Sequence, residues 1–300
     1  MVIIFVEIVS IKKGHNMQDT TELTELLKNA SPYIEQYKGK TMVVKYGGSA
    51  MQSEELKDSV MSDIVLLNSL GIKVVLVHGG GPELSDMLNR LGKESKFING
   101  LRYTDAETVE VALMILAGKI NKGLVSHIHK LGGKGVGLCG IDGGMLQAEK
   151  RPGEDLGFVG QINAVNTELI ISVLNDGFIP VISTVGIGDD GQAYNINADT
   201  AASEVAIALK AERLISLSDI RGVLRDVKDE NSLISVISLS DIHDLIETGI
   251  IEGGMIPKVE GCEDAIVRGV EEVSIIDGRI LHSLILELFS ENGIGTLIKK

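Results

Sequence analysis

Apolar residues follow two alternating patterns along the chain, and together these predict a layered α/β protein. Short apolar runs predict buried strands at 41–45, 73–77, 179–183, 214–217 and 273–276. Apolar residues at spacings of three and four predict amphipathic helices at 53–70, 82–91, 105–131, 169–176, 200–210, 239–248 and 259–268. Strands that alternate with helices are typical of a mostly parallel sheet covered on both faces.

The first 40 residues and a polar break near residue 190 suggest three segments. Residues 18–38 have the pattern of two helices, with a restart at Ser31 because Pro32 disfavours helical geometry in the residue before it. Residues 1–16 are interpreted as a misassigned start or a loose extension. We expect an N-terminal extension at 1–40, an N-terminal lobe at 41–188 and a C-terminal lobe at 189–300.

Composition removes several classes of function. With 28 basic and 42 acidic residues the formal net charge is −14, which disfavours nucleic acids and anionic membranes. Two cysteines among 300 residues favour neither a disulfide framework nor a zinc site, so we expect a reducing, cytoplasmic location. We find no run of about 20 apolar residues and expect no membrane span.

Glycine is frequent, at 35 residues, and two glycine clusters directly follow predicted strands. They read Lys45-Tyr46-Gly47-Gly48 and His78-Gly79-Gly80-Gly81-Pro82. Ligands of parallel sheets bind beyond the carboxyl ends of the strands, where glycine lets backbone N–H groups approach an anion. Neither cluster matches a Walker A or G-x-G-x-x-G motif, and each alone is also compatible with a tight turn. His78 we interpret as structural.

Three further clusters combine polar residues with predicted helix starts or turns. Asn195-Ile196-Asn197-Ala198-Asp199 precedes a helix, so its side chains are either caps or ligands. Ser218-Asp219-Ile220-Arg221-Gly222-Val223 ends a strand, and Gly253-Gly254-Met255-Ile256-Pro257-Lys258 places a lysine at a helix start.

With Asn99-Gly100-Leu101-Arg102-Tyr103-Thr104, these clusters resemble the amino-acid kinase superfamily and, within it, the acetylglutamate kinases. The resemblance covers residues 41–298. It implies a three-layer α-β-α sandwich around an open, mainly parallel eight-stranded sheet. It also implies ATP-dependent phosphorylation of the γ-carboxylate of N-acetyl-L-glutamate, with the acyl amino acid in the N-terminal lobe and the nucleotide in the C-terminal lobe.

The resemblance also assigns roles by motif position. Lys45 and Lys258 would flank the transferring phosphoryl group, Asp199 would orient both lysines, and Gly48 and Gly80 would donate backbone N–H groups. The acyl amino acid would contact Gly80, Gly81, Arg102, which clamps its α-carboxylate, and Asn195. The nucleotide would contact Lys45, Gly48, Asp219, Ile220, Arg221, Gly222, Val223, Leu224, Ile250, Ile251, Glu252 and Lys258.

The chemistry of this reaction fits these residue types. A glutamate side chain is ionised at neutral pH, so the nucleophile requires charge neutralisation rather than a general base. Lysines and backbone N–H groups supply that, and arginine suits bidentate binding of a carboxylate. We expect Mg²⁺ to arrive on the ATP phosphates and no metal site built from protein side chains.

The N-terminal helix and the C-terminal segment 282–296 resemble the arginine-inhibited members of this group. They imply homodimers joined into a hexamer through the N-terminal helix, and an arginine site at His282, Glu287 and Gly293. Alternatives remain open: a helix that packs only on its own subunit, a kinase of carrier-linked aminoadipate, an aspartate or glutamate 5-kinase, or a non-catalytic amino-acid sensor.

Overall fold

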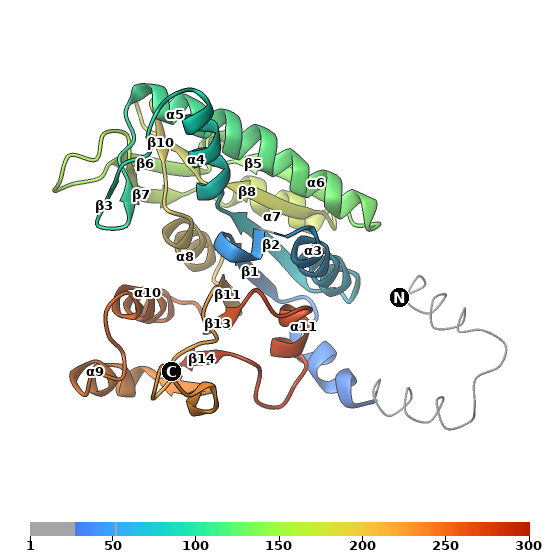
Figure 1. Cartoon of the computed structure of the whole chain (residues 1–300). Coiled ribbons are helices and arrows are strands. Elements are labelled where there is room, and N and C mark those ends of the chain that lie inside the picture. Colours follow the sequence, from blue (N-terminus) through green and yellow to red (C-terminus); the bar gives the residue numbers. More distant parts are fainter. Residues whose placement is uncertain (1–27, 52) are drawn as a thin grey trace.

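A single eight-stranded sheet forms the centre of the computed structural model, which describes residues 28–51 and 53–300. The strand order is β12-β14-β13-β11-β1-β2-β8-β5 (Figure 1). Neighbouring strands are parallel except β13 and β14, so the predicted open, mainly parallel sheet is confirmed. The strands span β1 (Thr41–Tyr46), β2 (Lys73–His78), β5 (Gly135–Cys139), β8 (Ile179–Ser183), β11 (Arg213–Ser218), β12 (Val236–Ser238), β13 (Glu272–Asp277) and β14 (Thr296–Lys299).

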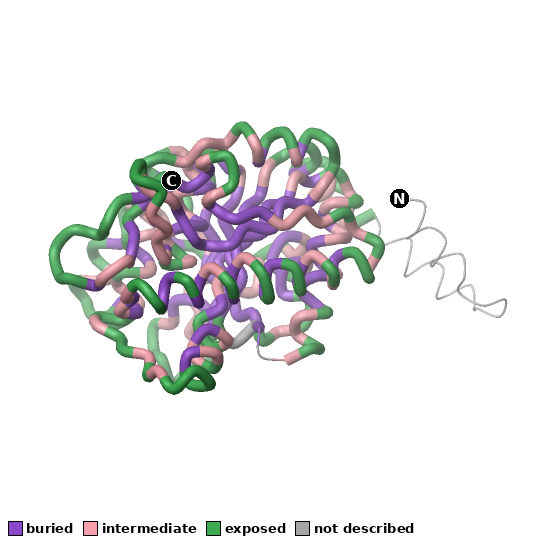
Figure 2. The backbone as a smooth tube through the Cα atoms, turned by 90° about the horizontal axis from the view of Figure 1, so that it is seen from above, coloured by how far each residue is buried: buried purple, intermediate pink, exposed green. Residues whose placement is uncertain are grey.

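Helices cover both faces of this sheet, because its strands have apolar residues on both faces, as in β1. Val44 and Tyr46 belong to one apolar core, whereas Val43 belongs to the other. The first core includes residues of α3 (Glu54–Ser69), α4 (Gly81–Arg90), α5 (Ala106–Leu113), α6 (Asn121–Lys130) and α11 (Ser283–Leu288). The second includes residues of α7 (Glu168–Asn175), α8 (Ala198–Ala208), α9 (Leu239–Glu247) and α10 (Met255–Val267). The sheet is thus the buried middle layer of the predicted three-layer sandwich (Figure 2).

The structure also contains a smaller four-stranded sheet and a two-stranded hairpin, which the sequence patterns did not predict. The small sheet has the order β10-β9-β6-β7, and the hairpin pairs β3 with β4. Their strands are short or have one exposed face, so they lack the continuous apolar runs of central strands. The bounds are β3 (Phe97–Ile98), β4 (Leu101–Arg102), β6 (Leu146–Lys150), β7 (Gly160–Val165), β9 (Val185–Ile187) and β10 (Ala193–Asn195).

The polar break at 189–192 is a hairpin turn inside one lobe. β9 and β10 pair antiparallel across it, and both belong to the small sheet. Strands β1, β2, β5 and β8 form one half of the large sheet, and β11 to β14 form the other. We therefore propose that the division between the lobes lies after β10, near the start of α8, rather than at 188/189.

Residues 28–37 are helical on both sides of Pro32, so the restart expected at Ser31 is wrong. A proline ring is tolerated near a helix start because the first N–H groups have no intrahelical acceptor. Tyr37 lies in the first core, and the Tyr33 ring packs edge-on against Phe289 at 6.4 Å. The rest of the predicted N-terminal extension lies outside the described residues.

The predicted helix 105–131 is helical from Ala106 to Lys130, but its middle, Met114–Ile120, is π-helical. By length and composition this stretch could cross a membrane, contrary to our expectation that no segment would qualify. In the fold α6 packs against β5, β8 and α3, which makes it a core helix. Leu116 and Ile120 of the π turn lie over the glycine cluster after β2. Their side chains are so close that a Cβ atom on Gly80 would collide with both.

This contact predicts that Gly80 cannot be enlarged without loss of stability. Gly80→Ala should lower the free energy of unfolding by about 1–3 kcal/mol, because overpacking forces the neighbouring side chains apart. Gly123→Ala is the control, because a Cβ atom there has open space. Gly123 lies inside α6, where alanine is favoured over glycine. Gly123→Ala should therefore raise the free energy of unfolding by no more than about 1 kcal/mol. Urea unfolding measures both, and equal stability of the two variants would contradict the steric argument.

Candidate active site

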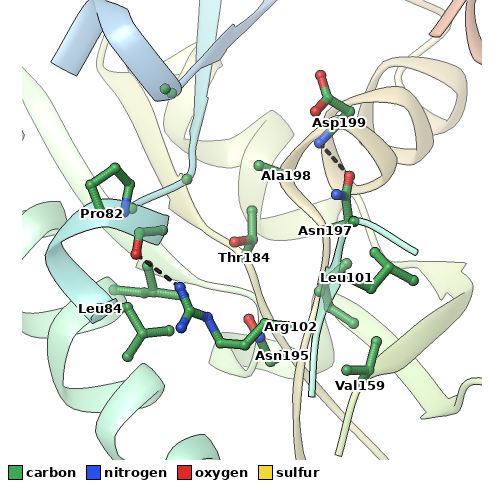
Figure 3. Close-up of a pocket in the computed structure, with 18 of the residues that line it drawn as sticks. Pro82, Leu84, Leu101, Arg102, Val159, Thr184, Asn195, Asn197, Ala198 and Asp199 are labelled. Carbon is green, nitrogen blue, oxygen red and sulfur yellow. Dashed lines mark hydrogen bonds between the residues drawn. The ribbon is translucent and has the colours of Figure 1, made fainter. Parts of the chain in front are cut away.

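The carboxyl ends of β1, β2 and β8 and the start of α8 surround a cavity of about 270 Å³. Parallel strands bring their carboxyl ends to one edge of the sheet, so segments far apart in sequence meet here. Figure 3 shows Arg102 and Asn195 near one end of this cavity and Asp199 near the other. The lining includes Lys45, Gly48, Gly80, Gly81, Arg102, Asn195 and Asp199, all of them predicted site residues.

Lys45 is a buried cation at one end of the site. Its side chain is 11% exposed, and its Nζ lies 3.1 Å from Oδ1 of Asp199. A buried ammonium requires a partner of opposite charge, which Asp199 supplies from the first turn of α8. The Asn197 side chain caps that helix by accepting from the N–H groups of Asp199 and Thr200. One residue of the predicted polar cluster is therefore a cap, and another is the counterion.

Lys258 reaches the same region from α10, which begins at Met255, directly after Gly253-Gly254 and four residues before the predicted start. Its Nζ donates to Oγ of Ser218 at 2.9 Å, and it lines a second cavity of about 490 Å³ with Lys45 and Asp199. Asp199 forms an ion pair with Lys45, whereas the Lys258 ammonium donates to Ser218, and all three residues line the second cavity. The end of β11, rather than α8, positions Lys258.

Arg102 is held rigidly at the far end of the first cavity. Its Nη2 donates to the Gly81 carbonyl at 2.9 Å and to Ser85 Oγ at 2.8 Å, and its guanidinium lies 4.7 Å from the centre of the Phe97 ring. Burial lowers the pKa of Arg102 from its ordinary value, but a guanidinium stays charged throughout the physiological range. Asn195 donates to Thr104 Oγ1 at 3.2 Å on the same side of the cavity.

The two glycine clusters line the same cavity as Lys45 and Arg102 and bring backbone N–H groups to it. Gly80 is the N-cap of α4, where the first N–H groups of a helix have no intrahelical acceptor. Gly48 has φ +63° and begins a short 3-10 turn after β1. N–H groups of this kind form an anion-binding site.

Eight of the twelve residues predicted to contact a nucleotide line a third cavity, of about 760 Å³, at the end of β11, whereas Lys45, Gly48 and Lys258 line the first two cavities. The lining of the third cavity includes Asp219, Ile220, Arg221, Gly222, Val223, Leu224, Ile250 and Glu252. Ile251 does not line it: this side chain is 1% exposed and belongs to the second apolar core. Motif position groups Ile251 with the nucleotide residues, but it does not determine which way a side chain points on a short irregular segment, and here Ile251 packs into the core.

The residues of the predicted arginine site lie along α11 and the loop after it. The buried Glu287 carboxylate accepts from the N–H groups of Ile294 and Gly295, and Gly293 stacks against it. His282 begins α11, and its Nδ1 lies 2.7 Å from Oδ1 of Asp63.

Sequence reasoning missed Ser218 as the partner of Lys258 and Phe97 as the ring beside Arg102. Ser218 carried a signal, because it directly follows a predicted strand and is the first residue of one of the polar clusters. Phe97 carried none, because its hairpin has only two residues in each strand.

Residues 40–277 match the model of the amino acid kinase family. The chain is 57% identical to the acetylglutamate kinase of Clostridioides difficile (strain 630), over 93% of this chain and 98% of that protein. It is 55% identical to the acetylglutamate kinase of Brachyspira hyodysenteriae, over 92% and 96%.

Solved structures share the fold. N-acetylglutamate synthase from Neisseria gonorrhoeae, complexed with coenzyme A and N-acetyl-glutamate, matches with a TM-score of 0.81 and 28% identity. The match covers 92% of this chain but 63% of the synthase, so the chain spans less than two thirds of it. Carbamate kinase from Giardia lamblia bound to AMP-PNP matches with a TM-score of 0.63, 18% identity and coverage of 87% and 99%.

The fold, the cavities at the strand ends and the matched residues define an amino acid kinase, and the chain belongs to that family. The identities above 50% over nearly whole chains place it among the acetylglutamate kinases.

Proposed function

We infer that the chain transfers the γ-phosphoryl group of ATP to the γ-carboxylate of N-acetyl-L-glutamate, in arginine biosynthesis. The products are N-acetyl-γ-glutamyl phosphate and ADP. The observation that carries this inference is the position of Lys45, which lines both the cavity that ends at Arg102 and the cavity that contains Lys258. The relatives' shared activity supports the same substrates.

In this proposal the acyl amino acid lies in the first cavity. Its α-carboxylate binds Arg102, and its γ-carboxylate points toward Lys45 and the glycine N–H groups. The γ-carboxylate is ionised at neutral pH and needs no general base. What limits its attack is repulsion from the phosphate, which fixed positive charge reduces.

The nucleotide base and ribose occupy the third cavity, and the phosphates extend toward Lys258. Lys45 and Lys258 approach the phosphoryl group from opposite lobes, so their charges stabilise the transition state only when both substrates are bound. Mg²⁺ enters as part of the ATP complex, with phosphate oxygens among its ligands. We place the enzyme in the cytoplasm.

A hydroxylamine assay tests the substrate. Acyl phosphates react with hydroxylamine, so ATP and Mg²⁺ with N-acetylglutamate should yield the hydroxamate. N-acetylaspartate, glutamate and carrier-linked aminoadipate serve as comparisons. Turnover of free glutamate without turnover of its acetylated form would overturn the substrate assignment, and no turnover of any acid would favour a sensor.

Loss of either lysine should affect the chemical step. Lys45→Met and Lys258→Met should each lower kcat by about 100-fold or more and leave KM nearly unchanged, because the charges act on the transition state. Lys40→Met is the control, since Lys40 pairs with Glu212 away from the cavities. Steady-state kinetics decides, and a near-normal kcat would remove that lysine from the mechanism.

Arg102→Lys should affect substrate binding instead. A lysine cannot form the bidentate pair with a carboxylate or bond Gly81 and Ser85 at once, so KM for N-acetylglutamate should rise by about 10- to 100-fold. KM for ATP should stay constant. If KM for ATP rose in parallel, Arg102 would be a general structural residue.

We also propose that arginine inhibits the enzyme through a site beside α11, and that dimers assemble into a hexamer through the N-terminal helix. A 27% identical synthase with a TM-score of 0.77 was solved with L-arginine, which supports an arginine site on this fold. The α11 cluster contains the buried Glu287 carboxylate, and Phe289 contacts Tyr33 of the N-terminal segment.

Deletion of residues 1–27 tests both ideas and spares Tyr33 and Tyr37, which pack on the core. The full chain should be inhibited by millimolar arginine, and the truncated chain should be active, uninhibited and dimeric. Activity assays and light scattering report these outcomes. An uninhibited full chain would contradict the regulatory proposal, and an unchanged mass after truncation would contradict the role of the helix in assembly.

A further inference from the structure

A buried histidine lies directly behind the glycine cluster of the first cavity. His78 ends β2, is 0% exposed and has no place in the mechanism described so far. Its Nδ1 lies 2.8 Å from the carbonyl oxygen of Gly79, and its Nε2 lies 3.1 Å from Nδ2 of Asn121. Both ring nitrogens therefore have a partner.

Asn121 determines which ring nitrogen carries the proton. Its Nδ2 also faces two backbone carbonyls, Leu138 at 3.2 Å and Val181 at 2.8 Å, and carbonyls can only accept. Its Oδ1 accepts from Lys122 Nζ at 3.1 Å. The two Nδ2 hydrogens are shared among these two carbonyls and His78 Nε2, and an amide nitrogen cannot accept. Nε2 therefore acts as an acceptor, and the proton of the neutral ring lies on Nδ1, where the Gly79 carbonyl accepts it.

The ring is neutral at physiological pH. Burial lowers the pKa of His78 to about 4, and the nearby Lys122 ammonium acts in the same direction. A neutral ring protonated at Nδ1 has one donor, and that donor faces the Gly79 carbonyl.

The peptide between Gly79 and Gly80 links this ring to the cavity. A trans peptide is planar, with its C=O and N–H pointing in opposite directions, and the described chain has no cis bond. A carbonyl held by His78 on the buried side therefore directs the Gly80 N–H the opposite way. Gly79 and Gly80 both line the first cavity, and no acceptor among the described residues receives the Gly80 N–H.

We propose that His78, with its tautomer set by Asn121, is a positioning residue that fixes the Gly79–Gly80 peptide so that the Gly80 N–H points at the transferring phosphoryl group. This inference rests on the proposed kinase activity.

The π turn contributes to the same arrangement. Leu116 and Ile120 lie against Gly80, and Asn121 follows the turn directly. The wider turn changes the helical phase of the residues after it, and each added residue corresponds to about 100° of rotation. An uninterrupted α-helix would aim Asn121 in another direction, so the distortion brings both contacts to the glycine cluster.

Two amide substitutions separate positioning from packing. The amide nitrogen of His78→Asn can occupy the place of Nδ1 and donate to Gly79, whereas that of His78→Gln occupies the place of Nε2 and leaves the carbonyl without a donor. We expect kcat of His78→Asn within about threefold of the parent. For His78→Gln we expect kcat to fall by about 10- to 100-fold. This loss is smaller than the roughly 10²- to 10³-fold loss of kcat on removal of an oxyanion donor, because the Gly80 N–H is still present. Both KM values should stay unchanged.

The control is His127→Leu, because the His127 ring lies on α6, as Asn121 does, but pairs with Asp58 rather than with His78. It should retain the parental kcat. A His78→Gln variant as active as His78→Asn, or a loss seen equally in KM and kcat, would overturn the proposal.

The tautomer is measured on the unmodified protein by ¹⁵N NMR with labelled histidine. A protonated Nδ1 and an unprotonated Nε2 on His78 support the proposal, and a proton on Nε2 overturns it even if both variants fail to fold. This result does not depend on turnover, so a parent chain inactive on N-acetylglutamate would contradict the proposed function alone.

Discussion

The ion pair between Lys45 and Asp199 is the interaction on which the organisation of the site depends. Lys45 lies one residue before the end of β1, a strand buried on both faces, where an unpaired ammonium would be strongly unfavourable. Its counterion comes from α8, at 3.1 Å, and α8 packs on both β1 and β11. The pair therefore fixes Lys45, on the half of the sheet that contains β1, against α8, the helix that connects the two halves of the sheet. Both the first and the second cavity open around it.

The site contains several positive charges, whereas the molecule as a whole is acidic. The chain has a formal net charge of −14, yet the proposed substrates are anions. Lys45, Arg102 and Lys258 come from three separate elements and meet where strand ends and helix starts also direct N–H groups outward. Arg102 and Lys258 are held by neutral partners such as Ser85 and Ser218, so their charge remains available to a ligand, whereas Lys45 is paired with Asp199.

Much of the fold was predictable because central strands and their covering helices leave strong periodic signals. The five predicted strands and the helices at 53–70 and 82–91 occur within a few residues of their expected bounds. The edge strands β5 and β12, the strand β14 next to β12, and the small sheet were not predicted, since short or half-exposed strands lack a continuous apolar run. The polar turn at 189–192 was taken for a lobe boundary because a hairpin turn and a linker have the same composition.

The sequence by itself determined which chemical groups the site contains: two lysines, an arginine, glycine N–H donors and an aspartate at a helix start. These groups can be recognised from the residue types beside a strand end or a helix start, which a short stretch of sequence contains. The tertiary structure alone decided the partners: Asp199 pairs with Lys45, Ser218 holds Lys258, Ile251 turns into the core, and Asn121 meets His78. These contacts join residues as many as 154 positions apart, as for Lys45 and Asp199. They follow from strand order and helix phase, which no short window of sequence contains.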